Sequence, residues 1–145
     1  MSSPPTLHLT NWPSRRLHGP GRAFTIMAAP RSWEHGAGTV HALVPRLNWM
    51  ADARSGRITF EHYERLLASV WAGSQLGPGR LWAQTGLTTS DLVDGDTLCC
   101  GCAVGAPCHR RTAAPFLVRA GWRVLLDGVE LVLASADPAV ETSQP

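Results

Sequence analysis

The chain contains no lysine, so all 13 of its fixed positive charges are arginine guanidinium groups. Two explanations are compatible with this: codon bias, or the use of a planar fork that binds phosphate or carboxylate through paired hydrogen bonds. Charged residues are few as well, at 17% of the sequence, while 44% of the residues are hydrophobic. This balance is typical of globular proteins and excludes a mainly disordered chain.

Long apolar segments are also missing, since no run approaches the ~20 residues of a membrane-spanning helix. The first residues, Met1 to Thr6, have neither a basic start nor an apolar stretch. We therefore expect no signal peptide, no membrane partner and a cytoplasmic location. Residues 1–5 and 135–145 are predicted to be flexible tails, and residues 6–134 to form a single domain, which is long enough to bury a core.

Positive charge is concentrated in the first part of the sequence. Residues 1–57 contain seven arginines and two acidic residues, whereas the remainder contains six arginines and nine acidic residues. The resulting charge of +5 on the first part is weak for extended nucleic acid but suits a phosphate-bearing ligand. The segment from Asn11 to Arg22 is too rich in proline and glycine to be regular, and is either an ordinary surface loop or an anion-binding loop.

Strands and helices alternate in the hydrophobic pattern. Thr59 is predicted to cap the clearest helix, because apolar residues follow it at helical spacing. Pro45 is expected to shorten or break the helix that contains it, and Pro115 to kink another. The predicted elements are strands at 6–10 and 23–28, a helix within 40–50 with Ser55-Gly56 as its end signal, a helix at 60–72, a strand at 97–100, a helix at 108–120 that ends at Gly121, and a hairpin of 122–126 and 129–133. We expect a single Rossmann-like α/β domain, with a mostly parallel sheet flanked by helices and a C-terminal β-hairpin.

The chemically richest stretch runs from Asp94 to Arg111. It contains all four cysteines of the chain, one of its six histidines and two adjacent arginines. Residues 96–126 have the length of a βαβ unit, in which ligands bind beyond the carboxyl end of the strand and at the start of the helix. We therefore expect a pocket there. The helix dipole and nearby cations are expected to make the Cys108 thiol easier to ionise.

Two motifs of this stretch resemble the domain-of-unknown-function 488 family. Thr97-Leu-Cys-Cys-Gly-Cys102 and Cys108-His109-Arg110 are similar to a cysteine at a strand end followed by a Cys-His-Arg triplet that opens a helix. Gly56 to Tyr63 resembles the family's helix entry with a central tyrosine, and Gly121 to Val124 its closing strand. The likeness implies a small Rossmann-like fold and the position of the pocket, and little about a reaction.

This resemblance covers residues 55–128 well and the N-terminal third poorly. The family's early motif, an arginine followed by proline and serine, has only the reordered Pro13-Ser14-Arg15 as a counterpart. Where many members have an acidic residue, this chain has Cys102. That difference favours a thiol or metal role at this position over a carboxylate role.

Three interpretations of the cysteines remain open. Cys108 is a nucleophile or the anchor of an anion pocket, with His109 as acid and base and the guanidinium groups of Arg110 and Arg111 on a phosphate. In the second interpretation Cys100, Cys102, Cys108 and His109 bind zinc. Against it, Cys108 and His109 would diverge by roughly 100° on a helix. In the third, the cysteines are small core residues, as expected for Cys99, which strand alternation points away from Cys100.

The expected function is an enzyme, a transferase or hydrolase, that acts on a nucleotide, a nucleobase or a related phosphorylated small molecule. The alternative is a non-catalytic nucleotide- or nucleic-acid-binding module stabilised by zinc. Tyr63 packs in the core or turns its hydroxyl to the pocket, and exposed tryptophans offer stacking surfaces for a base. The candidate catalytic residues are Cys108, His109, Arg110 and Cys100; the candidate substrate-binding residues are Ser14, Arg15, Arg16, Tyr63 and Arg111.

Overall fold

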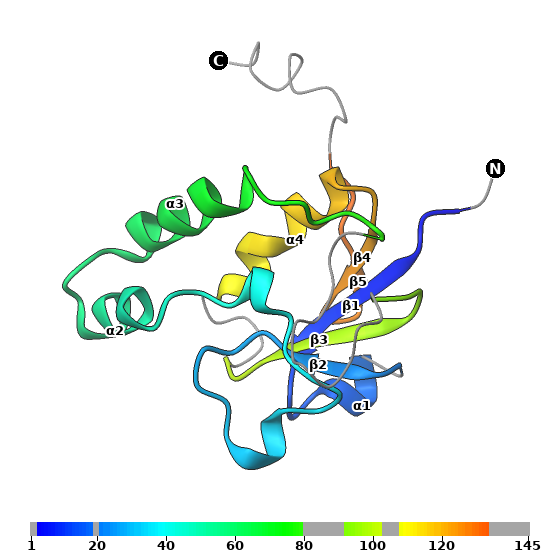
Figure 1. Cartoon of the computed structure of the whole chain (residues 1–145), viewed down its shortest axis with the longest axis horizontal. Coiled ribbons are helices and arrows are strands. Elements are labelled where there is room, and N and C mark those ends of the chain that lie inside the picture. Colours follow the sequence, from blue (N-terminus) through cyan, green and yellow to red (C-terminus); the bar gives the residue numbers. More distant parts are fainter. Residues whose placement is uncertain (1–2, 19–20, 80–91, 103–107, 134–145) are drawn as a thin grey trace, which may run out of the picture.

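A five-stranded sheet forms the centre of the computed structural model, which describes residues 3–18, 21–79, 92–102 and 108–133 (Figure 1). The strand order is β2-β3-β1-β4-β5; the first four strands are parallel and β5 is antiparallel to β4. The predicted Rossmann-like α/β class with a C-terminal hairpin is confirmed. The strands are β1 (Thr6–Asn11), β2 (Ala23–Thr25), β3 (Asp96–Cys100), β4 (Arg123–Leu126) and β5 (Val129–Glu130).

Side-chain alternation in β1 and β3 divides the interior into two parts. Leu98 and Cys100 of β3 are completely buried in the main core, together with Leu7 and Leu9 of β1. Cys99 points to the other face of the sheet, where it packs with Trp12 and Ala23. The prediction that Cys99 is a core residue turned away from Cys100 is therefore confirmed.

Three helices lie together on one side of the sheet, whereas the one-turn helix α1 (Arg15–His18) lies apart from them (Figure 1). These three are α2 (Leu47–Ser55), α3 (Phe60–Trp71) and α4 (His109–Arg119). α4 packs on β1, β4 and α3, and α3 packs on α2. The main core therefore lies between the sheet and α3 and α4, and α2 covers its open edge. Among the described residues, no helix is both long enough and apolar enough to span a membrane.

The helix ends follow the predicted signals. The Thr59 hydroxyl accepts a hydrogen bond of 3.0 Å from the N–H of His62, and α3 begins at the next residue. Gly56 and Gly121 have positive φ angles of 81° and 116° and follow α2 and α4. Both are favourable for glycine, because a side chain is strained in the left-handed region.

The expectation that Pro45 breaks the helix within 40–50 is confirmed: a 3-10 turn (His41–Leu43) precedes it and α2 follows it, since a residue before proline avoids helical angles and Val44 is extended. Several predicted boundaries are wrong. The segment expected to be irregular contains α1. β2 and β5 are shorter than predicted, and β3 and β4 do not adjoin because β1 lies between them. The predicted tail 135–145 lies outside the described residues.

Replacement of the α3 cap tests this part of the fold. We expect Thr59→Ala to lower the free energy of unfolding by about 1 kcal/mol, because the N–H of His62 loses its acceptor. Urea denaturation measures the change. Thr59→Ser keeps the hydroxyl and serves as the matched control, with an expected change within about 0.5 kcal/mol. An alanine variant as stable as the serine variant would contradict the capping role.

Candidate functional site

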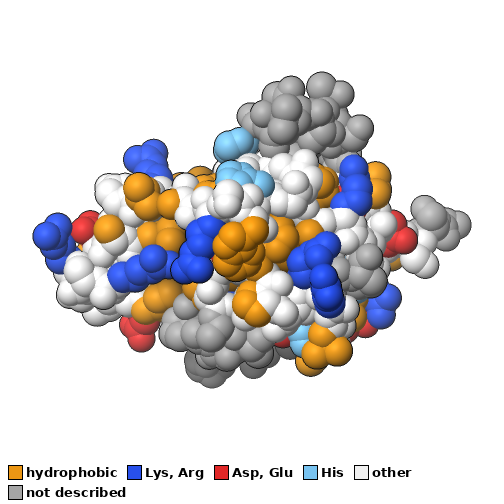
Figure 2. All heavy atoms as spheres, turned by 90° about the horizontal axis from the view of Figure 1, so that it is seen from below, with side chains coloured by type: hydrophobic (Ala, Val, Ile, Leu, Met, Phe, Trp, Pro, Cys, Tyr) orange, Lys and Arg blue, Asp and Glu red, His pale blue; other side chains and the backbone are white. Residues whose placement is uncertain are grey.

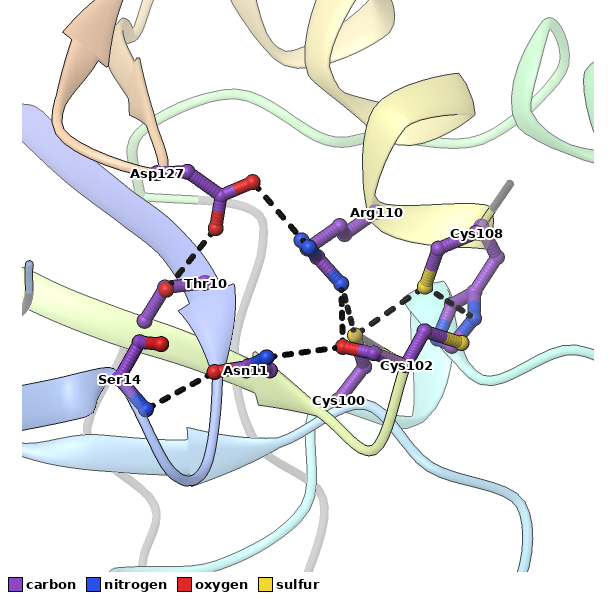
Figure 3. Close-up of polar contacts among 9 residues, drawn as sticks. Thr10, Asn11, Ser14, Cys100, Cys102, Cys108, Arg110 and Asp127 are labelled. Carbon is purple, nitrogen blue, oxygen red and sulfur yellow. Dashed lines mark hydrogen bonds and ion pairs between the residues drawn. The ribbon is translucent and has the colours of Figure 1, made fainter. Parts of the chain in front are cut away.

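Three cysteine side chains meet where β3 ends and α4 begins (Figure 3). β1 and β3 end side by side, with Asn11 opposite Cys100, and the chain returns to start α4 next to them. The sulfur atoms of Cys100, Cys102 and Cys108 lie within 4.8 Å of one another. The pocket position predicted from the βαβ pattern is thus occupied by a thiol cluster, which we define as these three residues.

A buried guanidinium lies against this cluster. Arg110 is completely buried, and its Nη1 donates to the Cys100 sulfur at 2.8 Å and to the Cys102 carbonyl at 3.1 Å. Its Nη2 donates to the Asp127 carboxylate at 3.1 Å, and the other carboxylate oxygen accepts from the Thr10 hydroxyl at 2.9 Å (Figure 3). Arg110 was expected to clamp a phosphate, but its guanidinium is enclosed in the interior. The guanidinium donates to the Cys100 sulfur instead.

The Cys108 sulfur and the His109 ring lie close together, although neighbouring residues of a helix would point in different directions. Cys108 precedes the first turn of α4 and has extended backbone angles, with φ of −155°, so the expected 100° divergence of two helical neighbours is wrong. Its sulfur lies 3.7 Å from Nδ1 of His109, whose Nε2 lies 2.7 Å from the Ile26 carbonyl oxygen. Since a carbonyl only accepts, Nε2 carries the proton and the lone pair of Nδ1 faces the Cys108 thiol.

The pKa shifts within the cluster favour a thiolate at Cys102 over one at Cys108. The pKa of Cys102 is lowered because Cys100 and Cys108 donate hydrogen bonds to its sulfur and because the guanidinium groups of Arg110 and Arg54 lie near it. The pKa of Cys108 is raised by its hydrogen bonds to the other two sulfurs and by burial. The expectation that Cys108 ionises most easily is therefore wrong, because neighbouring sulfurs outweigh the helix start. Burial also lowers the pKa of His109, which stays neutral.

A cavity of about 220 Å³ opens in front of the cluster, and we call it the thiol cavity. Cys100 is completely buried and does not line it. Tyr63 is 4% exposed and packs in the main core, as expected in one of its two placements, and it is also a lining residue of the cavity. Burial raises the pKa of its hydroxyl, which stays protonated. The lining residues are Cys102, Cys108 and His109, with Met50, Ala53 and Arg54 from α2 and Phe60 and Tyr63 from α3.

Arg54 is a candidate site residue without a sequence signal. It lies one residue before the Ser55-Gly56 helix end and resembles any exposed arginine of a surface helix. Only the packing of α2 against α3 brings it to the cavity, where it supplies the single guanidinium among the described lining residues. It therefore takes the place that we had expected Arg111 to fill, since Arg111 is exposed and is not part of the lining.

The predicted residues of the N-terminal loop lie elsewhere. Arg15 and Arg16 line a second cavity, together with Trp12 and Trp33, and do not line the thiol cavity. Ser14 contributes its backbone N–H, which donates to the Asn11 side chain at 2.8 Å. The Asn11 amide in turn donates to the Cys102 carbonyl at 3.0 Å (Figure 3). Asn11 thus connects the arginine loop to the cysteine loop without bringing the arginines to the sulfurs.

The thiol cluster could hold a metal ion, because three sulfur donors lie close together. Thiolates are suitable ligands for zinc and other soft ions. The sulfurs of Cys100 and Cys108 are 3.1 Å apart, which is closer than the ~3.8 Å edge expected for tetrahedral zinc with Zn–S bonds near ~2.3 Å. His109 is outside the group of converging ligand atoms, so the predicted four-residue set is brought together only in its three cysteines.

A larger depression of about 1070 Å³ lies at the amino ends of β1 and β4, near Pro4, Arg119 and Leu131. Its lining contains no cysteine or histidine among the described residues. The thiol cavity is smaller but contains two cysteines and a histidine in its lining, so it is the candidate site that we consider further.

Comparisons with protein-family models, with curated proteins and with solved structures found no match to this chain. The resemblance to the domain-of-unknown-function 488 family therefore stays a prediction based on the quoted motifs. The site has to be interpreted from its own geometry.

The neutral state of His109 predicts a pH dependence of stability. Its pKa is lowered in the folded protein, so the unfolded chain binds its proton first, near the ordinary value of about 6.5. His109 therefore makes its full contribution to the free energy of unfolding above this value. As the pH is lowered below it, the free energy of unfolding falls by at most about 1.4 kcal/mol per pH unit from this group.

Urea denaturation between about pH 7.5 and about pH 5.5 measures the effect, and His109→Gln is expected to make the dependence shallower. The glutamine amide keeps a donor for the Ile26 carbonyl. His62→Gln, at an exposed position of α3, is the matched control and should follow the wild type. A glutamine variant at position 109 whose curve runs parallel to the wild type would contradict the assignment.

Proposed function

We propose that the protein is a thiol-dependent enzyme, a transferase or hydrolase, that acts on a nucleotide, a nucleobase or a related phosphorylated small molecule. The observation that carries the proposal is the Cys102 sulfur, which is half-buried, has a lowered pKa and lies in the wall of the thiol cavity. An ionised sulfur that faces a cavity is a nucleophile in contact with whatever the cavity holds. Cys102 therefore replaces Cys108 as the attacking residue.

The remaining groups of the cluster support the thiolate and supply protons. Attack by Cys102 forms a bond from its sulfur to an electrophilic substrate atom and breaks the bond to the leaving group. Cys108 stays protonated and lines the same cavity, so it is the nearest acid for that leaving group. Nδ1 of His109 faces the Cys108 thiol and can take or return its proton. The substrate fragment on Cys102 then passes to an acceptor or to water.

The volume of the cavity and its aromatic lining favour a ligand with one planar ring. Its volume of about 220 Å³ is smaller than the ~300–1,000 Å³ typical of ligand pockets, so only part of a larger molecule enters. Phe60 and Tyr63, with ring centroids 5.5 Å apart, provide aromatic wall for a base. Arg54 is exposed at the cavity and is suited to a phosphate. A nucleotide satisfies these features together.

Alkylation by iodoacetamide tests the nucleophile. We expect a thiol that reacts quickly well below pH ~8.5, the pKa of free cysteine, because the Cys102 thiolate persists there. Cys102→Ser should remove this fast reaction, whereas Cys108→Ser should retain a fast-reacting thiol. Arg54→Gln, which changes an exposed residue, should shift the profile to higher pH. A fast reaction that survives in Cys102→Ser, or a profile like that of free cysteine, would contradict the proposal.

A second candidate function is a zinc-stabilised, non-catalytic module that binds nucleotides or nucleic acid. The observation in its favour is the convergence of three sulfurs within 4.8 Å. Zinc binding requires these thiols to be deprotonated together. The guanidinium of Arg110 already donates to the Cys100 sulfur at 2.8 Å and lies where it repels a second cation. We therefore favour the enzyme.

Metal analysis separates the two candidates. For the enzyme we expect purified protein to contain much less than one zinc ion per chain and to keep its melting temperature in excess chelator. The physical reason is that the guanidinium groups of Arg110 and Arg54 stabilise a single thiolate at Cys102 without a metal. Stoichiometric zinc, together with unfolding on chelation and loss of zinc in Cys100→Ser, would instead support the zinc-stabilised module.

A further inference from the structure

The second cavity, defined by Trp12, Pro13, Arg15, Arg16, Trp33 and Gly36, has a volume of about 350 Å³. Trp12 packs with Cys99 and Ala23 on the sheet face opposite the main core, so this cavity is separate from the thiol cavity. Figure 2 shows the molecule from the side of α1 and the loop that follows β2, where apolar side chains lie between groups of arginines. We call it the arginine–tryptophan cavity.

Two side chains of its lining, those of Trp12 and Arg15, each contain a buried N–H donor, Nε1 and Nε, that has no acceptor among the described residues. The Trp12 side chain is more than nine-tenths enclosed, with an exposed fraction of 8%. A buried donor without an acceptor costs about 1–3 kcal/mol, so two of them in side chains that line one cavity are unusual.

The cavity is shaped by a close approach of the loop after β2. Gly36 has a φ angle of 56°, and a Cβ atom there would lie 2.2 Å from the Ala23 carbonyl oxygen and 2.8 Å from the Trp12 ring. Only glycine permits this approach. The N–H of Ala37 donates to the same Ala23 carbonyl at 2.7 Å and fixes the loop. The loop therefore fixes the position of Trp33 beside the arginines of α1.

Charge and aromatic surface indicate the kind of ligand. Arg15 and Arg16 bring two guanidinium groups to the cavity, and a third, from Arg31, lies 5.7 Å from the ring centre of Trp33. The nearby carboxylate of Glu34 is buried and is bound by the Arg31 backbone N–H at 2.9 Å, so it is turned into its own loop. Trp33 is 59% exposed, which leaves aromatic surface for stacking.

We propose that the arginine–tryptophan cavity is a mononucleotide-binding site. The guanidinium groups of Arg15 and Arg16 bind the phosphate, and Trp33 stacks on the base. This site goes beyond the proposed function, because it lies on the other face of the sheet and contains none of the cysteines. Its volume of about 350 Å³ falls within the ~300–1,000 Å³ usual for small-molecule sites, unlike that of the thiol cavity.

Calorimetric titration with AMP tests the site, with adenosine and inorganic phosphate as partial ligands. We expect AMP to bind and adenosine to bind much more weakly, because it lacks the charged group. Arg16→Gln changes an exposed residue and should weaken AMP binding roughly 10- to 100-fold, the value of one charge-assisted hydrogen bond. Trp33→Ala should weaken AMP binding and leave phosphate binding unchanged. Arg65→Gln, at an exposed position of α3, is the matched control and should bind AMP like the wild type.

The same titrations distinguish failure of this proposal from failure of the enzyme proposal. Arg16→Gln should leave the alkylation profile of Cys102 unchanged, because Arg16 does not line the thiol cavity. AMP binding that is lost in Arg54→Gln but kept in Arg16→Gln would place the nucleotide in the thiol cavity and overturn the inference. Equal affinity for AMP and adenosine, binding of short single-stranded RNA without binding of AMP, or no binding at all would also overturn it.

Discussion

The buried guanidinium of Arg110 is the constraint on which the site depends. It connects the end of β3, the first turn of α4 and the turn between β4 and β5, through Cys100 and Asp127. A fully buried cation is tolerated only when it is paired, and loss of one partner of a buried pair typically costs about 3–5 kcal/mol. Here one partner is a sulfur, so the interaction that holds the corner of the fold together also sets the charge on the thiols.

Hydrogen bonds among the three sulfurs lower the pKa of one thiol and raise that of another. A single cysteine at a helix start would be the one to ionise, but here Cys108 is enclosed and donates to its neighbours. Cys102 receives their hydrogen bonds, lies nearer the surface and has the guanidinium of Arg54 beside it. The cluster therefore contains one half-buried sulfur with a lowered pKa that lines the thiol cavity, one buried sulfur with a raised pKa, and one, Cys100, that accepts a hydrogen bond from Arg110.

The two cavities lie on opposite faces of the sheet and have different linings. One has sulfur atoms, aromatic wall and a single guanidinium, and the other has two arginines, two tryptophans and buried N–H donors. Asn11 lies between them at the end of β1, where its amide contacts the Cys102 carbonyl and its oxygen accepts from the Ser14 N–H. This uncharged side chain therefore links the arginine loop to the cysteine loop through two hydrogen bonds.

Local patterns in the sequence were sufficient for the fold class, for the caps at Thr59, Gly56 and Gly121, and for the position of the thiol cluster, since these depend on residues close together in the chain. Tertiary structure alone decided which sulfur is ionised, that Arg110 turns inward to Asp127, and that Arg54 and not Arg111 reaches the cavity. Burial, shared protons and the packing of α2 on α3 join residues that are far apart in sequence, and no local pattern contains that information.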